Sequence, residues 1–205
     1  LSPVHHGLIK ASEKREFALD MLNRVGLDSL ALGRYPHQFS GGQRQRIGIA
    51  RALAVSPELL VCDESIAALD VSIQAQVLNL FVKLKQDYDL TYLFISHDIG
   101  VIEHISDRVI VMYLGRIVET APIEAFVKQP NHPYTKALLE GVPRLEIGHR
   151  DYEPVSGEIP SPLDPPTGCH FHPRCKHSSE RCVALSSHTS PHPTSLLSPH
   201  FTLAW

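Results

Sequence analysis

The chain has 205 residues, of which 43% are apolar and 20% charged, and its formal net charge is -3. That apolar share is large enough for a folded core, which excludes wholesale disorder. The 19 basic and 22 acidic residues nearly balance, so the sequence predicts no nucleic-acid partner. It contains no run of about 18 apolar residues, the length that a membrane-spanning helix requires. Its four cysteines are too few for a secreted disulfide scaffold.

Proline separates two kinds of sequence, because 13 of the 16 prolines fall from Pro122 onward. The part before Pro122 can form long helices and buried strands, and the part after it is expected to hold short elements and loops. Apolar periodicity and capping residues predict helices over 12–25, 40–54 and 72–85, and strands over 59–62, 91–95, 107–112 and 116–119. The apolar strand 59–62 is expected to be buried on both faces. Strands that alternate with helices indicate an α/β domain with a largely parallel sheet.

The first predicted helix has recognisable ends. Ser12 is a candidate N-cap and Gly26 a candidate C-terminal exit, while Phe17, Met21 and Val25 share one face at helical spacing. In the 72–85 helix the same spacing places four apolar residues inward: Val77, Leu80, Phe81 and Leu84.

The last 23 residues, from Val183 to Trp205, contain no Asp, Glu, Lys or Arg. Soluble tails are seldom built with so little charge. One hypothesis is that residues 183–205 result from translation in a shifted frame, which the coding DNA can test.

A glycine pair marks the start of the 40–54 helix, in the string Ser40, Gly41, Gly42, Gln43. Glycines let a backbone approach a ligand closely, and Ser40 can cap the helix. The unpaired N–H groups and positive dipole end of a helix N-terminus form an anion site. A Ser-Gly-Gly string alone is more often a flexible turn, but the full seven residues 40–46 are much harder to reach by chance.

Polar side chains follow two of the predicted strands. Asp63 and Glu64 come directly after 59–62, at the carboxyl edge of the sheet, where ligands bind in open α/β folds. Asp63 could hold Mg²⁺ through water, and Glu64 could orient or deprotonate a water that attacks a phosphate. Asp70 lies in the next loop, and His97 ends the 91–95 strand at the same edge. Taken singly, each is more often a solvated turn residue or a structural histidine.

In this order the four motifs resemble those of the ATP-binding-cassette (ABC) ATPases. Residues 40–43 resemble the signature motif, 59–64 the Walker B strand, 68–70 the D-loop, and His97 the switch histidine. The resemblance implies a partial ABC-type nucleotide-binding domain, with a helical subdomain and a parallel-sheet core.

The same resemblance assigns roles and cofactors. It implies ATP and Mg²⁺ as cofactors, with Glu64 and His97 catalytic and Asp63 holding Mg²⁺ through water. The residues that it assigns to nucleotide binding are Ser40, Gly41, Gly42, Gln43 and Asp70.

A narrower resemblance lies further along the chain. Residues 131–135 (Asn-His-Pro-Tyr-Thr) and 169–175 (Cys-His-Phe-His-Pro-Arg-Cys) resemble the C-terminal extension of the ATP-binding subunits of bacterial oligopeptide and dipeptide importers. The resemblance divides the chain into 1–115, the C-terminal portion of the ATPase domain; 116–182, the peptide-importer extension; and 183–205, an atypical tail.

Membership of such an importer implies an assembly. The expected partners are a second ABC ATPase subunit, two membrane-spanning permease subunits and a periplasmic peptide-binding protein. The expected location is peripheral, on the cytoplasmic face of the bacterial inner membrane, where ATP hydrolysis is coupled to uptake of di- or oligopeptides.

Three cysteines, Cys169, Cys175 and Cys182, are spaced C-x5-C-x6-C. They are either three reduced thiols or ligands of a metal or iron–sulfur cluster, as the resemblance suggests for some relatives. The spacing is not that of a zinc ribbon. An iron–sulfur cluster usually needs four thiolates, and no cysteine follows Cys182, which weighs against a cluster. Cys62, on the predicted Walker B strand, is interpreted as a small apolar residue.

The phosphate-binding loop G-x-x-x-x-G-K-[ST] that the family mechanism needs does not occur in these 205 residues. It is expected upstream, so we interpret the chain as N-terminally truncated and expect it to be poorly soluble and unable to hydrolyse ATP alone. It could still offer residues 40–43 to the P-loop of an intact partner. The alternative is an inactive remnant or a docking module. A third alternative, an ABC protein of DNA maintenance, is disfavoured by the balanced charge and by the block at 131–175.

Overall fold

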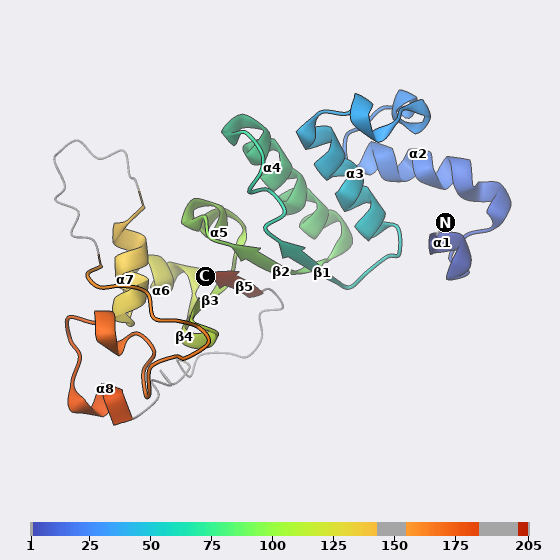
Figure 1. The fold of residues 1–205 in the computed structure, drawn as a ribbon. Helices are drawn as coiled ribbons and strands as arrows, with labels where there is room; N and C mark the ends of the chain where they lie inside the picture. Colours follow the sequence, from blue (N-terminus) through green and yellow to red (C-terminus); the bar gives the residue numbers. More distant parts are fainter. Residues whose placement is uncertain (1, 143–154, 185–200, 205) are drawn as a thin grey trace. The chain divides into compact units, whose positions relative to one another are not determined.

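The structure is a computed structural model that describes residues 2–142, 155–184 and 201–204 (Figure 1). The chain divides into two compact units, Leu1–Leu93 and Phe94–Trp205. Within the part of the chain that the structure describes, no helix is long and apolar enough to cross a membrane.

The first unit is mainly helical. Its elements are α1 (Ser2–His5), η1 (Ala11–Glu13), α2 (Lys14–Arg24), η2 (Ser29–Gly33), η3 (Pro36–Gln38), α3 (Gly41–Leu53), β1 (Leu59–Asp63) and α4 (Val71–Tyr88), and β2 (Thr91–Ser96) begins in it. In Figure 1, α3 lies between α2 and α4, and it packs against both.

The predicted first helix is present, but it starts differently. Ser12 lies in the 3-10 turn η1, and α2 begins at Lys14 after Glu13, so the prediction that Ser12 caps the helix is wrong. The cause is local: the Glu13 carboxylate accepts the N–H of Lys10 at 2.9 Å and closes a tighter turn ahead of the helix. Gly26, with φ +71, follows the C-terminal end as predicted.

Helix α4 forms the main apolar face of the first unit. The four residues predicted to point inward are all buried: Val77, Leu80, Phe81 and Leu84. The helix is longer than predicted: it ends at Tyr88 and is followed by Asp89, whose backbone is left-handed (φ 50). Carbonyl O of Lys85 accepts the N–H groups of Asp89 and Leu90 there, which satisfies the helix end.

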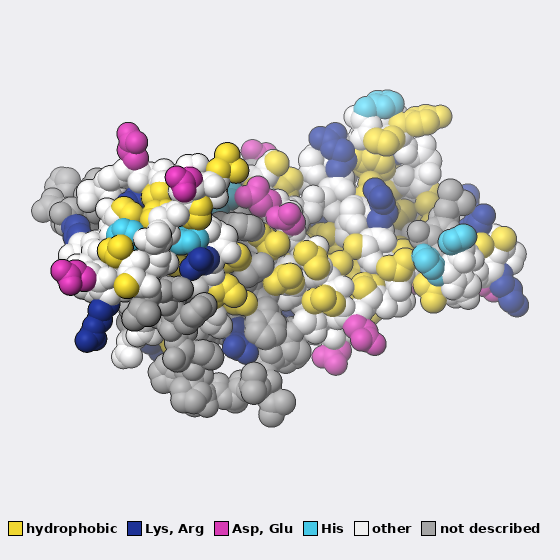
Figure 2. All heavy atoms as spheres, turned by 60° about the horizontal axis from the view of Figure 1, so that its bottom comes forward, with side chains coloured by type: hydrophobic (Ala, Val, Ile, Leu, Met, Phe, Trp, Pro, Cys, Tyr) yellow, Lys and Arg dark blue, Asp and Glu magenta, His cyan; other side chains and the backbone are white. Residues whose placement is uncertain are grey.

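Strand β1 forms where predicted, but only one of its faces is buried. Leu60 and Cys62 are buried, whereas Leu59 and Val61 are 53% and 56% exposed. The prediction of burial on both faces is therefore wrong, because no element among the described residues covers the Leu59 and Val61 side. Figure 2 shows many apolar side chains at the molecular surface, and these two are among the exposed apolar residues.

The second unit holds the rest of β2 and a series of short elements, as the proline distribution predicts. They are α5 (Ile99–Ile105), β3 (Arg108–Tyr113), β4 (Arg116–Pro122), α6 (Ile123–Lys128), α7 (Pro133–Glu140), η4 (His172–Arg174), α8 (Glu180–Ala184) and β5 (Phe201–Ala204).

Strands β3 and β4 form the predicted antiparallel hairpin, with Tyr113 opposite Arg116. Leu114 and Gly115 connect them with positive φ angles of 44° and 74°, the backbone of a tight two-residue turn. Strand β5 pairs with β3 in parallel, with Val109 opposite Thr202. Strand β5 was not predicted from the sequence.

The core of the second unit joins the hairpin to the later segment. Val109, Val111 and Phe126 are fully buried in one cluster that also contains Cys169 and Phe171. Helices combined with parallel and antiparallel strand pairs confirm the predicted α/β class.

Candidate functional site

The N-terminus of α3 is built by reciprocal capping. Oγ of Ser40 accepts the N–H of Gln43 at 3.2 Å, and Oε1 of Gln43 accepts the N–H of Ser40 at 3.1 Å. Gly41 and Gly42 occupy the first two helical positions, whose amides lie outside the intrahelical hydrogen bonds. Their N–H groups and the positive end of the helix dipole suit an anion such as a phosphate oxygen.

Gly42 is buried where the first turns of α3 and α4 meet. A Cβ at this position would overlap Cγ2 of Ile73 in α4, and a Cβ at Gly41 would lie 3.6 Å from Cδ2 of Leu69. The two glycines therefore let the capped N-terminus lie against the segment that contains Asp70. The structure thus brings together two groups that the sequence assigns to nucleotide binding, residues 40–43 and Asp70.

Arginines hold α3 in this orientation. Nη1 of Arg46 donates to the carbonyl O of Val25 at 2.9 Å, and Nη2 donates to Oε1 of Gln76 in α4 at 3.4 Å. Nη1 of Arg44 donates to the carbonyl O of Phe39 at 3.0 Å, just before the capped turn. These charge-assisted bonds tie one helix to its neighbours on both sides.

The carboxylates predicted to act on the cofactor are accessible. Asp63 is the last residue of β1, and Asp63, Glu64 and Asp70 are all exposed. Glu64 has a φ of 44°, a left-handed conformation that is uncommon for a non-glycine residue and that clusters at functional sites. Exposed carboxylate oxygens at a strand end are a suitable donor set for a hydrated Mg²⁺.

Asp70 has a second, structural role as the N-cap residue of α4. Its carbonyl O accepts the N–H of Gln74 at 2.8 Å, while its carboxylate makes no capping bond. The side chain therefore keeps its oxygens on the exposed side of the helix start.

His97 lies in the other compact unit, directly after β2, and its side chain is exposed. The backbone after it is fixed by Asp98, which accepts the N–H groups of Gly100 and Val101 at 2.9 and 3.3 Å and caps α5. Oγ of Ser96 accepts the N–H of Asp98 at 3.0 Å. The histidine thus sits on a short connection held at both ends.

The three C-terminal cysteines lie in the second unit as free thiols. Cys169 is buried, with its Sγ 4.0 Å from Nε2 of His132. Hydrogen bonds from the side chain and backbone of Ser179 lower the pKa of the Cys182 thiol. Within 2–142 and 155–184, no three His, Cys, Asp or Glu side chains are arranged to hold a metal ion.

A buried carboxylate that the sequence analysis did not single out organises the start of α7. Glu119 is 2% exposed and accepts the N–H groups of Asn131 and His132, both at 2.9 Å. Nδ1 of His132 accepts the N–H of Tyr134 at 3.1 Å. Burial lowers the pKa of His132, while the nearby Glu119 opposes that shift. Glu119 lies in the predicted strand 116–119 and His132 in the block 131–135, but nothing in the sequence shows that the two residues are in contact.

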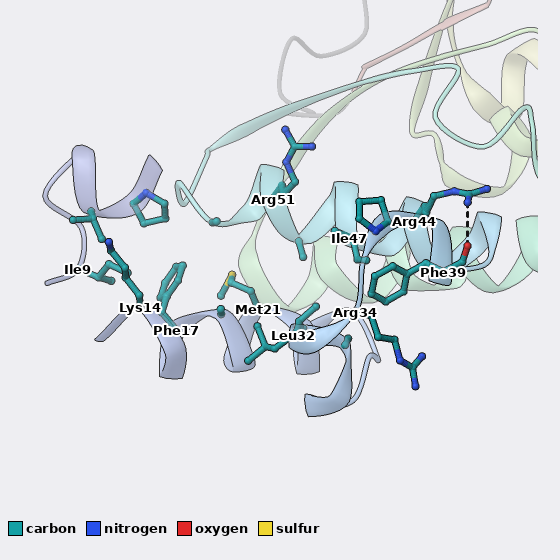
Figure 3. A pocket seen from close by; sticks show the side chains of 18 residues that line it. Ile9, Lys14, Phe17, Met21, Leu32, Arg34, Phe39, Arg44, Ile47 and Arg51 are labelled. Atoms are coloured by element: carbon teal, nitrogen blue, oxygen red, sulfur yellow. Dashed lines mark hydrogen bonds between the residues drawn. The ribbon is translucent and has the colours of Figure 1, made fainter. Parts of the chain in front are cut away.

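The structure also contains an apolar pocket that was not predicted from the sequence. It has a volume of about 590 Å³ and lies in the first unit, between α1, α2, the 31–39 segment and α3. Figure 3 shows Phe17, Met21 and Ile47 among its lining residues, while the guanidinium groups of Arg34 and Arg51 point away from them. The helical spacing of Phe17 and Met21 signals an apolar face, but not a cavity.

Comparison with known proteins adds two matches in separate parts of the chain. The model of ABC transporters matches residues 4–67, and the model of the oligopeptide/dipeptide transporter C-terminal region matches residues 118–182. The first part of the chain is thus similar to ABC transporters, and the later part to the C-terminal region of oligopeptide/dipeptide transporters. The first match contains residues 40–43 and β1, and the second contains Glu119, His132 and all three C-terminal cysteines.

Two curated ATP-binding proteins match most of this chain. It is 50% identical over 185 residues to the dipeptide transport ATP-binding protein DppF of Haemophilus influenzae, covering 90% of this chain and 57% of that protein. It is 52% identical over 180 residues to the oligopeptide transport ATP-binding protein AppF of Bacillus subtilis, covering 86% of this chain and 55% of that protein. The chain thus spans about half the length of the curated relatives it matches.

Solved ABC structures share the fold. The ADP conformation of MJ1267, an ATP-binding cassette of an ABC transporter, superposes with a TM-score of 0.53 at 27% identity, over 62% of this chain and 50% of that one. An ABC transporter in an inward-facing conformation gives a TM-score of 0.56 at 27% identity, over 66% of this chain and 51% of that one. The predicted partial ABC-type fold is confirmed.

Proposed function

We propose that this chain acts in the ATP-binding, energy-coupling subunit of a bacterial ABC importer for di- or oligopeptides. The observation that carries the proposal is the order of the two matches: an ABC transporter segment at 4–67 is followed by the oligopeptide/dipeptide transporter C-terminal region at 118–182. The relatives named for dipeptide and oligopeptide transport match across both segments.

The residues of the first unit suit one side of a nucleotide. The amides of Gly41 and Gly42 would bind phosphate oxygens at the N-terminus of α3, with Ser40 and Gln43 holding the turn in place. Bound ATP would supply the phosphoryl group, together with Mg²⁺ as its counter-ion. Asp70, next to this turn, would position the nucleotide-binding segment through its cap of α4.

The residues at the ends of β1 and β2 would carry out the proton and metal chemistry. Asp63 would hold Mg²⁺ through water, and Glu64 would orient or deprotonate the attacking water. His97 would contact the transferred phosphate. Positioning and charge stabilisation, which these groups provide, are the main requirements of phosphoryl transfer.

The proposed assembly would contain several partner subunits. Residues 40–43 would face the P-loop of a second ATP-binding subunit. The remaining partners would be two membrane-spanning permease subunits and a periplasmic peptide-binding protein. The chain would then lie peripherally on the cytoplasmic face of the inner membrane.

Nucleotide-dependent association tests this proposal. The 205-residue chain is mixed with an intact ATP-binding subunit of a bacterial dipeptide importer that binds ATP without turning it over. We expect MgATP to tighten their association at least tenfold relative to MgADP. The variant Gly41→Glu should abolish this gain, because its carboxylate repels phosphate but suits the helix dipole, so that α3 still forms. Gly48→Glu is the matched control, since a Cβ at Gly48 on the same helix meets open space.

The same assay separates the proposal from an inactive remnant or docking module. The remnant or docking module predicts association that is equal with MgATP, with MgADP and without nucleotide. It also predicts that Gly41→Glu behaves like the unsubstituted chain. In both cases we expect no ATP turnover by the chain alone, and turnover would contradict the assignment of the P-loop to a partner.

A further inference from the structure

Strand β5 (Phe201–Ala204) lies inside the sheet and not at its edge. The strand order is β1-β2-β5-β3-β4, so β5 has a hydrogen-bonded neighbour on each side. It runs parallel to β3, with Ile110 opposite Leu203 (Figure 1). Without β5 the sheet would separate into the pairs β1-β2 and β3-β4.

Strand β3 has the features of an internal strand. It pairs with β4 on one side, with Val109 opposite Ala121, and with β5 on the other. Val109 and Val111 are fully buried, and β3 contains no proline and no charged residue after Arg108. Buried backbone N–H and carbonyl groups need hydrogen-bond partners, so the edge of β3 that faces away from β4 requires a strand.

Strand β2 has the same requirement. From Phe94 onward it belongs to the same unit as β3 and β5, Phe94 and Ser96 are buried, and its sequence contains neither charge nor proline. By contrast, β4 lies at the edge of the sheet and contains Arg116 and Pro122, residue types that protect the edges of natural sheets. Because β2 and β3 lack such protection, the position between them suits a further strand.

The attachment of β5 allows it to exchange. Its register with β3 covers three residue pairs, from Val109–Thr202 to Val111–Ala204, and short pairings of this kind open locally without global unfolding. Residues 185–200 tether β5 to α8, and tethers of such length give an effective concentration of about 1 mM. A free segment of the same sequence can therefore compete with β5 at a comparable concentration.

We propose that the position between β2 and β3 is a strand-binding site, which takes an extended, uncharged segment parallel to β3. In a single chain β5 fills this site, and the same segment of a second copy of the chain competes for it. Recognition is through the backbone hydrogen bonds of strand addition, and exchange of an identical element between copies is a known route to dimers. The inference concerns the second unit and does not depend on ATP binding.

A proline at position 203 tests the site in the full chain. In a strand with neighbours on both sides, each N–H group lies toward one of them, so Leu203→Pro removes a ladder hydrogen bond and disfavours the pairing. Leu196→Pro is the matched control, because it makes the same substitution in a segment that already contains Pro191, Pro193 and Pro199.

Hydrogen exchange measures whether β5 covers β3. In the unsubstituted chain we expect the β3 amides to be protected on both edges of the strand. Leu203→Pro should raise the exchange rate of the amides on the β5 edge at least tenfold and leave those that pair with β4 slow, whereas Leu196→Pro should change neither. Fast exchange on the β5 edge of the unsubstituted chain would overturn the proposal, whatever the variants do.

Peptide binding measures the exchange of the strand. A fluorescein-labelled peptide of residues 198–205 is titrated into each full chain and followed by fluorescence anisotropy. We expect it to bind the Leu203→Pro chain at least tenfold more tightly than the unsubstituted or Leu196→Pro chain, in which the tethered β5 competes. Equal affinity for the three chains would overturn the proposal.

The unsubstituted chain gives a result that does not depend on the folding of any variant. Because the tethered β5 competes for the site, half-saturation by the peptide should lie near the effective concentration of about 1 mM. A peptide that itself carries Leu203→Pro should not bind. No binding of the native peptide at several times about 1 mM, or equal binding of the proline peptide, would overturn the proposal.

Discussion

Gly42, in the first turn of α3, and Ile73, in the first turn of α4, are so close that a methyl group at position 42 would overlap Cγ2 of Ile73. The glycine is therefore required by packing between helices as well as by the proposed approach of a phosphate. Its neighbour Gly41 has ordinary van der Waals space, so the two glycines differ in what they tolerate.

Gly42→Ala should lower the free energy of unfolding by about 1–3 kcal/mol, the usual effect of overpacking. Gly48→Ala, in the same helix with open space around its Cβ, should instead raise it by about 0.5–1 kcal/mol through helix propensity. Urea unfolding measures both. In an Ile73→Ala background the effect of Gly42→Ala should fall by at least half, since the overlapping group is gone. An undiminished effect would show that Ile73 is not the obstacle.

Local chemistry explains which parts of the site could be predicted from the sequence. The start of α3 depends on Ser40 and Gln43, which are three residues apart and bond to each other, so the string itself contains the information. Ser12 shows the limit of the same rule. The nearby Glu13 bonds to Lys10 and forms a different turn, and a capping propensity does not show which of two adjacent polar residues will dominate.

Contacts between distant residues account for what the sequence could not show. An apolar strand such as β1 can be buried on one face or on two, and only the elements packed over it decide that Val61 is exposed. Glu119 and His132 are 13 residues apart, and no periodicity links them. The hydrogen bond between the backbones of Cys169 and Cys182 likewise depends on the absence of a side chain at Gly168.

Buried His132 should make the stability of the second unit depend on pH. Burial lowers its pKa in the folded state, so between the folded value and the unfolded value of about 6.5 the unfolded chain binds more protons. The contribution of neutral His132 to the free energy of unfolding should therefore be fully present above about pH 6.5, and it should decline as the pH falls below that value. The urea midpoint at pH 7.5 and pH 5.5 measures the decline.

His132→Asn isolates this contribution, because asparagine can still accept the N–H of Tyr134 at the helix start but does not titrate. The variant should lose less stability between pH 7.5 and pH 5.5 than the unsubstituted chain. His104→Asn, at an exposed position in the same unit, controls for removal of a histidine. Identical pH dependence in His132→Asn and the unsubstituted chain would contradict the assignment.

Cys62 should be chemically inert in the folded chain. It is 4% exposed on β1, and burial raises the pKa of its thiol to about 12, which removes the reactive thiolate at neutral pH. We expect iodoacetamide at pH 8 to alkylate the partly exposed Cys182 at least 100-fold faster than Cys62 in the native chain. In urea the two rates should approach each other. Comparable native rates, followed by mass spectrometry, would show that β1 opens readily.

The exposed face of β1 should limit the solubility of this chain. Leu59 and Val61 are more than half exposed, and β1 stands at one edge of its sheet, beside β2. An apolar edge strand promotes association between copies. Val61→Lys should raise the concentration at which the chain stays monomeric by severalfold, measured by analytical ultracentrifugation. Ile117→Lys is the matched control, because Ile117 is 52% exposed on β4, and it should have a smaller effect. If the unsubstituted chain is monodisperse at high concentration, or both substitutions act equally, the Leu59 and Val61 face is not the cause of association.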